Sequence, residues 1–239
     1  MTTIDLDIPD YLRRQKDNTL PQFAKPLVYS YTLLKTADTC LYKVYRQYIK
    51  RDLPFDKTPE IDWGNKVHEA MEYRLGGKPL PVEMLHWEPI VAVYAERKAK
   101  PEKKTGITRE CKPTGFFDKD VWLRCKIDVT MLHGSNVFIS DFKTGNSRYE
   151  DPFELEIQAL TLKAAIPQIE KIAGHYAWLK ESRIGETHDL SDFNATWAKI
   201  NNKVEAIEDC QVSGEWPKTQ NKLCPWCAVL DCEFNPKKT

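Results

Sequence analysis

The sequence ISDFKTG, residues 139–145, ends an apolar run with Asp141, continues with Phe142 and then places Lys143. Residues two positions apart in a β-strand lie on the same face, so the carboxylate and the ammonium group would point the same way. A carboxylate can bind Mg²⁺ or Mn²⁺, and a lysine beside it can orient a water molecule or stabilise charge that builds on a phosphoryl group. Taken alone, the pattern is more typical of an exposed strand end with a local ion pair.

A second acid, Asp128, lies inside the apolar stretch DVWLRCKIDVTML, residues 120–132, where strand propensity disfavours aspartate. The alternation of this stretch predicts one apolar face made of Val121, Leu123, Cys125, Ile127, Val129 and Met131. Asp128 would lie on the opposite face, and it can approach Asp141 if the two strands pair through the short turn between them. Two close carboxylates repel unless a cation neutralises them, so the pair favours a site for Mg²⁺ or Mn²⁺.

Three further residues could complete such a site. His68 lies on the predicted helix WGNKVHEAMEYRL, residues 63–75, and imidazole suits Mn²⁺ more than Mg²⁺, although a lone helical histidine is usually a hydrogen-bonded surface residue. Glu110 lies in a predicted strand and is a third candidate acid, but it is equally typical of an exposed strand glutamate. Gln158 could hydrogen-bond the site or a nucleic acid, and by itself it is uninformative.

The elements that must position these residues are predicted as three helices, three strands, a helix, a strand and a last helix. Helices are predicted at 29–50, 60–75, 82–100, 153–165 and 191–210, and strands at 107–111, 120–132, 136–143 and 171–181. This order indicates an α/β fold with a mixed sheet. Residues 1–28 contain prolines and little periodicity, which predicts an N-terminal arm.

The composition limits the classes of function. A chain of 239 residues with 41% hydrophobic and 29% charged residues can bury a core and is predicted to be globular. Lys+Arg and Asp+Glu both number 35, so a nucleic-acid site would have to gather positive charge locally. No stretch approaches 18 apolar residues and the N-terminus does not resemble a signal peptide, so a cytoplasmic location in a bacterial, archaeal or phage-infected cell is expected.

The cysteines of the C-terminal segment have the spacing of metal ligands. In KLCPWCAVLDCEF, Cys224, Cys227 and Cys232 form a C-x2-C-x4-C run, which needs a fourth ligand from elsewhere. This spacing suits an iron–sulphur cluster or zinc, and buried free thiols are a further alternative. The other pattern-based prediction is core packing of the two cysteines in predicted strands, Cys111 and Cys125.

The first predicted helix combines cations and aromatic rings, which are the ingredients of single-strand binding. The candidate DNA-binding residues are Lys43, Tyr45, Arg46 and, near the acids, Arg148. An ordinary amphipathic helix with a solvated basic edge is an equally good interpretation. The sequence contains no Walker A loop, so unwinding would require another protein or existing single strands.

Taken in order, the motifs resemble the RecB-like branch of the PD-(D/E)XK nuclease superfamily. The residues that carry the resemblance are Gly64-x3-His68, Asp128, Asp141-Phe-Lys-Thr-Gly145 and Gln158, preceded by a helix in which Cys40 comes before basic and aromatic residues. The match spans about residues 29–235. It implies a restriction-endonuclease-like domain over 29–239, divided into a helical part (29–105), a nuclease core (106–213) and a cluster-binding tail (214–239).

The resemblance also implies roles for single residues. The implied metal ligands are His68, Asp128, Asp141 and the backbone carbonyl of Phe142. Lys143 would be the catalytic lysine and Gln158 would support the site. Glu110 is not part of this resemblance and stays a candidate catalytic acid that could hold a second metal or a metal-bound water. The chain departs from the family pattern at Cys125, Val129 and Leu162, where glycine, arginine and tyrosine are usual. These departures affect the expected strand packing and DNA contacts.

The cysteine motif resembles that of the CRISPR-associated exonucleases and AddB-type subunits of this branch. The resemblance implies that Cys40 joins Cys224, Cys227 and Cys232 in holding a [4Fe–4S] cluster that fastens the chain ends together, with zinc as the less favoured substitute. Cys210 is the rival for the fourth ligand.

The expected function is therefore a metal-dependent DNA exonuclease that acts on single-stranded or frayed ends in recombination, repair, phage DNA metabolism or CRISPR adaptation. The expected cofactors are Mg²⁺ or Mn²⁺ and the cluster, and the expected partners besides DNA are a helicase, a recombinase or CRISPR adaptation proteins. The alternatives are a catalytically idle DNA-binding scaffold and a zinc-ribbon nucleic-acid binder.

Overall fold

The computed structural model describes residues 26–53 and 58–237, and it divides into two compact units. The first unit comprises Thr58–Thr196, and the second combines the described residues before Thr58 with those from Trp197 onward. These boundaries differ from the three-part division expected from the sequence. Most of the predicted arm at 1–28 lies outside the described residues.

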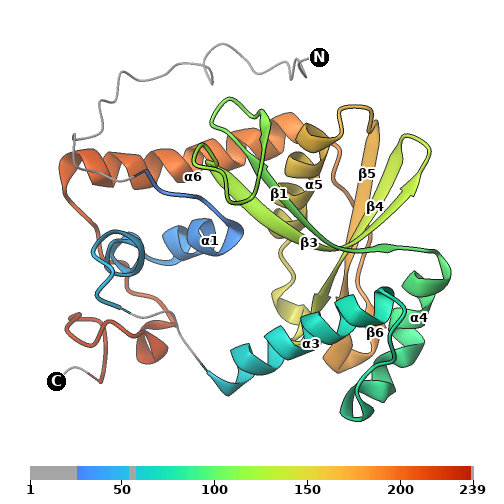
Figure 1. Cartoon of the computed structure of the whole chain (residues 1–239). Helices are drawn as coiled ribbons and strands as arrows, with labels where there is room; N and C mark the ends of the chain where they lie inside the picture. The colour runs from blue at the N-terminus through green and yellow to red at the C-terminus, as the bar shows by residue number, and fades with distance from the viewer. Residues whose placement is uncertain (1–25, 54–57, 238–239) are drawn as a thin grey trace. The chain divides into compact units, whose positions relative to one another are not determined.

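The first unit contains a mixed sheet flanked by helices, as Figure 1 shows. Its helices are α3 (Pro59–Leu75), η2 (Val82–Trp87), α4 (Glu88–Glu96), η3 (Ser147–Tyr149), α5 (Phe153–Ala165) and η4 (Leu179–Glu181). Its strands are β1 (Lys100–Ile107), β2 (Pro113–Thr114), β3 (Leu123–His133), β4 (Asn136–Lys143), β5 (Lys171–Trp178), β6 (Arg183–Ile184) and β7 (His188–Asp189). The predicted α/β class with a mixed sheet is confirmed.

The strand order is β2-β1-β3-β4-β5-β6, with β7 also paired to β5. Among the strands of the described residues, only β4 and β5 pair in parallel, and α5 is the crossover between them. β4 therefore lies inside the sheet and its C-terminal end faces the start of α5. The predicted hairpin of β3 and β4 is present, with Val129 opposite Ser140 and His133 opposite Asn136. The register therefore brings the neighbouring Asp128 and Asp141 to the same level of the sheet.

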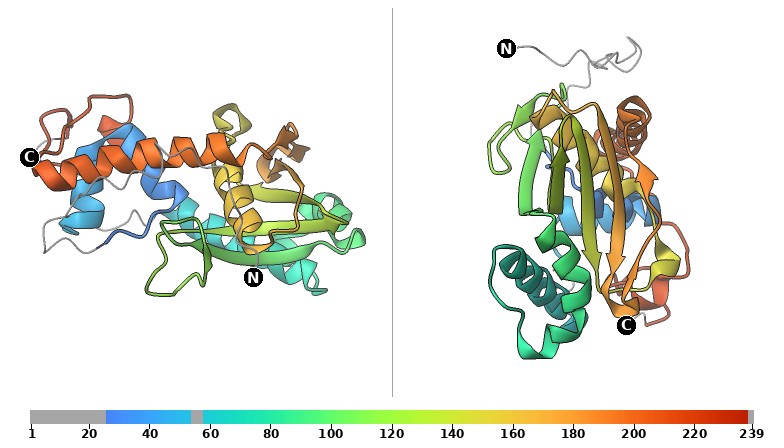
Figure 2. Two further views of the ribbon diagram at one scale, coloured as in Figure 1. Left: turned by 90° about the horizontal axis from the view of Figure 1, so that it is seen from above. Right: turned by 90° about the vertical axis from the view of Figure 1, so that its right-hand side faces the viewer.

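Two apolar cores cover the two faces of this sheet. On one face, Met71 of α3 and Val91 of α4 pack with Phe142 of β4. On the other face, Leu155 of α5 packs with Ile139 of β4 and further apolar residues of β5. Figure 2 shows α5 on the side of the sheet opposite to α3 and α4. Asp141 is two residues after Ile139 on β4, so its side chain lies on the same face of the sheet, towards α5.

The predicted single apolar face of β3 is wrong. Cys125 and Ile127 pack in the core beneath α5. Val129 and Met131 follow at the same two-residue spacing but pack in the core beneath α3 and α4. The alternation of side chains must therefore change side at Asp128, as happens where a strand bulges or twists strongly. This break lets Asp128 face helix α3 while it remains beside β4.

Several predicted element boundaries are corrected by the structure. The strand predicted at 107–111 ends at Ile107, where β1 ends, and the following residues form a turn that contains Glu110 and Cys111. The helix predicted at 82–100 begins as a 3₁₀ segment and ends at Glu96. The helix predicted at 153–165 is confirmed to the residue.

The second unit is built from short elements and an irregular tail. Its elements are α1 (Tyr31–Thr39), α2 (Leu41–Val44), the π-helix η1 (Tyr45–Ile49), most of α6 (Phe193–Ser213) and η5 (Cys224–Trp226). The helix predicted at 29–50 is thus interrupted at Cys40, whose extended backbone (φ −168°, ψ 115°) separates α1 from α2. In the part of the chain that the structure describes, no helix has the length and apolar character needed to cross a membrane.

Candidate functional site

The end of β4 carries the centre of a polar cluster in the first unit. Lys143 Nζ lies 2.7 Å from Asp141 Oδ2 and 2.7 Å from Glu154 Oε2. Gln158 Nε2 donates a hydrogen bond of 2.8 Å to Asp141 Oδ1. Both α5 residues face β4 because they are four positions apart on the same side of the helix. The expectation that Asp141 and Lys143 share a face, with Gln158 nearby, is confirmed.

Asp128 joins the cluster from β3. Its Oδ2 accepts a hydrogen bond of 2.9 Å from the backbone N–H of Phe142 and lies 3.0 Å from Nδ1 of His68 on α3. The Phe142 N–H belongs to the residue between Asp141 and Lys143, so Asp128 is fixed directly beside them. The structure therefore brings together the five side chains that the sequence placed in one site, namely His68, Asp128, Asp141, Lys143 and Gln158.

Burial and mutual repulsion set the charges of the acids. Burial and the charge of Asp141 raise the pKa of Asp128 above its usual value. Burial and the charge of Asp141 also raise the pKa of Glu154 to about 7, with Lys143 opposing the shift. Three carboxylates thus compete for one ammonium group, and an added cation would relieve that competition.

The carboxylates raise the pKa values of both bases of the cluster. Burial alone would lower the pKa of Lys143, but the charges of Asp141 and Glu154 outweigh it and raise that pKa. Burial also opposes protonation of His68, while its hydrogen bond to Asp128 and the charge of that carboxylate raise the pKa overall. Lys143 is therefore an ammonium ion at neutral pH, suited to stabilising negative charge rather than to removing a proton.

Glu154 is a member of the cluster that the sequence analysis missed. The sequence signal for Glu154 is its position four residues before Gln158, at the start of α5, because residues i and i+4 share a helix face. The signal was weak, since glutamate in the first turn of a helix is common for electrostatic reasons alone.

The chemistry of the cluster suits a hard divalent cation. Two of its buried oxygens are available to a cation, since Gln158 Oε1 has no hydrogen bond and Asp141 Oδ2 has the ion pair with Lys143 as its close contact. Carboxylate oxygens, a carbonyl and an imidazole are ligands that Mg²⁺ and Mn²⁺ accept. Within residues 26–53 and 58–237, no group of three or more His, Cys, Asp and Glu side chains has the mutual spacing of a metal site.

Two predicted site residues lie elsewhere in the first unit. Glu110 is exposed in the turn after β1 rather than in a strand, and its carboxylate accepts a hydrogen bond of 2.8 Å from Thr108 Oγ1. The prediction that it is a strand acid is therefore wrong, because β1 has already ended at Ile107. Arg148 is exposed on η3, five residues beyond Lys143.

Two of the predicted DNA-binding residues, Tyr45 and Arg46 on η1, make contacts within the second unit. Arg46 is buried, and its guanidinium binds Asp52 at 2.7 Å and Asp231 at 2.6 Å, contacts that raise its pKa. The Tyr45 ring stacks on Trp216 with centroids 5.4 Å apart. These contacts favour structural roles for both residues. Their predicted contacts with DNA, like that of Lys43, stay predictions.

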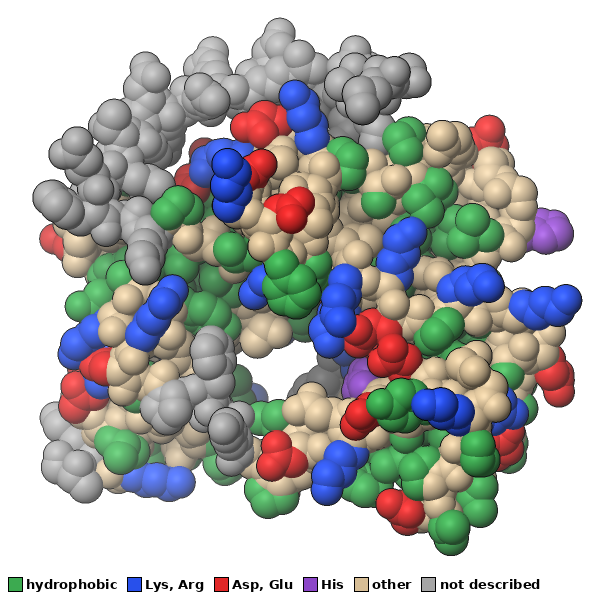
Figure 3. Space-filling model, viewed as in Figure 1, with side chains coloured by type: hydrophobic (Ala, Val, Ile, Leu, Met, Phe, Trp, Pro, Cys, Tyr) green, Lys and Arg blue, Asp and Glu red, His purple; other side chains and the backbone are tan. Residues whose placement is uncertain are grey.

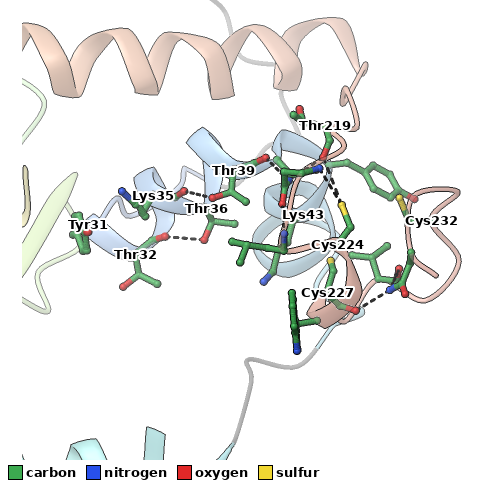
Figure 4. Close-up of a pocket in the computed structure, with 17 residues that line it drawn as sticks. Tyr31, Thr32, Lys35, Thr36, Thr39, Lys43, Thr219, Cys224, Cys227 and Cys232 are labelled. Carbon is green, nitrogen blue, oxygen red and sulfur yellow. Dashed lines mark hydrogen bonds between the residues drawn. The ribbon is translucent and has the colours of Figure 1, made fainter. Parts of the chain in front are cut away.

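Four cysteines of the second unit line one cavity of about 350 Å³. Cys224, Cys227 and Cys232 lie on the tail and face α1 and α2, as Figure 4 shows, and Cys40 lines the same cavity from the break between these helices. The backbone N–H of Asn221 lies 3.3 Å from Cys224 Sγ, the kind of contact that stabilises a thiolate ligand. The donor set fits a thiolate-bound group.

The other cysteines are separate from this set. Cys210 is buried and lines a different cavity with Asp209 and Trp216, so it is a weaker candidate than Cys40 for a fourth ligand. Cys125 hydrogen-bonds to Thr105 and Thr161, and burial raises its pKa to about 11. Burial raises the pKa of Cys111 to about 12, and this residue lies in a turn instead of the predicted strand.

Comparisons with known proteins leave the family of this chain open. No family model matches the chain, and no curated protein sequence matches it. One similar solved structure is the crystal structure of SSO0001, which is 14% identical, with 95% of this chain and 96% of that chain covered and a TM-score of 0.49. A likeness at this level supports no argument about activity.

Proposed function

We propose that the chain is a metal-dependent DNA nuclease of the RecB-like PD-(D/E)XK type, with a restriction-endonuclease-like core in its first unit. The observation that carries the proposal is the meeting of side chains from α3, β3, β4 and α5 in one cluster. The members are distant in sequence, and each is of the type that the motif requires.

The ligands of a divalent metal in this site would be His68, Asp128, Asp141 and the backbone carbonyl of Phe142. Bound Mg²⁺ or Mn²⁺ would supply Lewis-acid polarisation of a phosphate and activation of water. The chain's own residues prepare the site, since Gln158 holds one oxygen of Asp141 and the Phe142 N–H holds one oxygen of Asp128. Lys143 supplies a fixed positive charge next to the position of the phosphate.

The substrate that best suits the chain is a single-stranded or frayed DNA end, which an exonuclease would shorten. The charge is balanced over the sequence, and Figure 3 shows cationic and anionic side chains interspersed on the face it presents. This charge distribution does not favour a wide basic surface for a long duplex. A helicase or recombinase would supply opened DNA. The proposed setting is recombination, repair, phage DNA metabolism or CRISPR adaptation.

The proposal extends to a [4Fe–4S] cluster in the second unit, with Cys40, Cys224, Cys227 and Cys232 as ligands. What supports it is that these four cysteines line a single cavity although Cys40 and Cys224 are 184 positions apart in the sequence. Zinc would fit the same thiolates and is the alternative. The cluster's role would be to fasten the start of the unit to its end.

The test is degradation of end-labelled single-stranded DNA with Mg²⁺ or Mn²⁺ present, compared with metal-free buffer. Lys143→Ala should slow cleavage about 10²- to 10³-fold, the usual loss when one transition-state charge contact is removed. The matched control is Lys126→Ala, which removes an exposed lysine paired with Glu102 from the neighbouring strand and should cleave normally. Circular dichroism of both variants checks the fold.

Two results would contradict the proposal, the first in its mechanism and the second in its function. Equal cleavage by wild type and Lys143→Ala would remove the lysine from the mechanism. Binding of DNA by the wild type without metal-dependent cleavage would leave the DNA-binding scaffold as the better function.

A further inference from the structure

The turn between β2 and β3 presents two adjacent phenylalanines. Gly115, Phe116, Phe117 and Asp118 form a β-turn, closed by a hydrogen bond of 3.1 Å from the Asp118 N–H to the Gly115 carbonyl. Asp118 Oδ2 also accepts hydrogen bonds from the Gly115 N–H at 2.8 Å and from Thr114 Oγ1 at 3.0 Å. Figures 1 and 2 show the segment between β1 and β3 as a loop that extends from these strands. The turn is thus fixed by its own contacts.

The residues at the centre of this turn break the usual rules of turn composition. Central turn positions are usually occupied by glycine, proline, asparagine, aspartate or serine. Here they hold Phe116 and Phe117, and Phe117 is 78% exposed. An exposed aromatic ring on a turn gains little from folding, and two adjacent rings at positions that favour small or polar residues are consistent with a contact outside the chain.

The two rings form a small platform with a cation beneath it. Their centroids are 4.9 Å apart in an edge-to-face arrangement. The Arg124 guanidinium lies 4.7 Å from the centre of the Phe116 ring and donates a hydrogen bond of 3.3 Å to the Phe116 carbonyl. Phe116 is therefore held from below, while Phe117 leaves a ring face available to a planar ligand.

The charges around the platform favour a polyanion. The exposed cations of this segment are Arg109, Lys112 and Lys119, in addition to the half-buried Arg124. Its three acids are Glu110, Asp118 and Asp120. Glu110 and Asp118 are hydrogen-bonded within the segment but keep their charges, so the four cations exceed the acids by one formal charge. This small positive balance is compatible with a phosphate chain.

The platform is attached to the strand that carries the proposed metal ligand. Arg124, under the Phe116 ring, precedes Asp128 by four residues on β3, which corresponds to about 13 Å along an extended strand. That is on the order of four stacked nucleotides at about 3.4 Å each. A single strand of DNA can therefore span the platform and the polar cluster.

We propose that Phe117, supported by Phe116 and Arg124, is a base-stacking platform that grips single-stranded DNA a few nucleotides from the cleavage site. The inference rests on the proposed nuclease function and adds a binding residue to it that has no part in metal binding. Base–aromatic stacking tolerates any base, so the grip would not select a sequence.

The experiment measures binding of a fluorescent oligo(dT) by anisotropy without divalent cation, beside cleavage with Mn²⁺. Phe117→Ala and Phe117→Leu should each raise Kd about fivefold or more, whereas Phe117→Trp should bind as tightly as wild type or more tightly. The matched control is Leu132→Ala, which truncates another exposed apolar residue, at the far end of β3, and should leave Kd unchanged. Because Phe117 is exposed, none of these variants loses core packing.

The outcomes separate this inference from the nuclease proposal. If the wild type cleaves DNA but Phe117→Ala binds it equally well, the platform is excluded and the nuclease stands. If Phe117→Leu keeps full affinity while Phe117→Ala loses it, the contact is apolar rather than stacking, and the inference is wrong. If the wild type neither binds nor cleaves DNA, the proposed function fails first and the platform loses its ligand with it.

Discussion

The polar cluster of the first unit and the cysteine cavity of the second are organised by different means. In the cluster, each side chain projects from a regular strand or helix, and hydrogen bonds from Gln158 and the Phe142 backbone fix both aspartates. Around the cavity, α2 has four residues and η5 has three, and residues 214–237 outside η5 are irregular. One site is carried by a sheet, and the other by short segments.

This difference indicates which of the two proposed sites would need a bound group for its structure. The sheet of the first unit buries two apolar cores whether or not a metal is bound, so there the metal would serve catalysis. In the second unit, the contacts that join the tail to the segment from α1 to η1 include the Asn221 side chain with the Thr39 carbonyl at 3.1 Å and Arg46 of η1 with Asp231. Four thiolates around one cluster would be the strongest link between these segments.

The largest predicted effect follows from removing that link. Cys227→Ser should abolish absorbance near 400 nm and leave the tail and the segment from α1 to η1 unprotected against hydrogen exchange, because short elements cannot stay ordered alone. The strands of the first unit should keep their protection. Hydrogen exchange followed by mass spectrometry measures both units in one experiment.

The control for this prediction is Cys210→Ala, which removes a buried thiol from outside the cysteine cavity. It should keep the absorbance and the protection of the tail. If the wild-type protein is colourless and contains zinc, the bound group is zinc and not an iron–sulphur cluster. A Cys227→Ser protein with unchanged colour and unchanged tail protection would remove this cysteine from the ligand set.

A smaller effect is predicted inside the polar cluster. Glu154→Gln keeps an oxygen within reach of Lys143 but removes the charge that holds it at 2.7 Å. Lys143 would then be drawn towards Asp141 alone, and we expect the cleavage rate constant to fall about tenfold with little change in KM. Single-turnover cleavage of labelled DNA measures this rate.

The matched control is Glu156→Gln, which changes the same residue type two positions further along α5, on a different side of the helix. It should leave the rate unchanged. A rate for Glu154→Gln equal to that of wild type would mean that Asp141 alone positions the lysine.

Most of the fold was accessible from the sequence because its periodic patterns are strong. The helix at 153–165 and the strand at 136–143 were predicted with their observed bounds, since each apolar pattern is framed by turn residues. The change of side at Asp128 was not accessible. Apolar residues continue at every second position through β3, and only the presence of a core on both faces lets the strand change side without exposing them.

The candidate site was accessible for a different reason. The shared face of Asp141 and Lys143 followed from strand parity, and Asp128 was brought beside them by the turn between β3 and β4, which the structure contains. Parity alone did not place Asp128, because β3 changes side at that residue. Glu154 was missed because the sequence does not show which face of α5 meets the sheet. Glu110 was misplaced because a run of alternating residues, ITREC, continues past the point where the turn begins.

The smallest predicted effect is on the acid stability of the first unit, and it involves the sheet face opposite to α5. His175 lies on β5, where its Nε2 is 2.7 Å from the Tyr94 hydroxyl, which also lies 2.9 Å from Ser140 Oγ. Burial, assisted by the charge of Arg97 and opposed by that of Glu150, lowers the pKa of His175 to about 4. This network belongs to the face covered by α4, away from Gln158 and Glu154 on α5.

The pH dependence follows from which state binds the proton. Between pH 6.5 and about 4, the unfolded chain protonates this histidine and the folded chain does not, so the free energy of unfolding falls as the pH falls. We expect His175→Gln to remove about 1–2 kcal/mol of that loss, less than the full shift would give because the ring is partly exposed. Urea unfolding at pH 7 and pH 4.5 measures the difference, with His133→Gln, an exposed histidine at the end of β3, as control. If wild type and His175→Gln lose equal stability over this range, the acid response of the first unit belongs to its carboxylates.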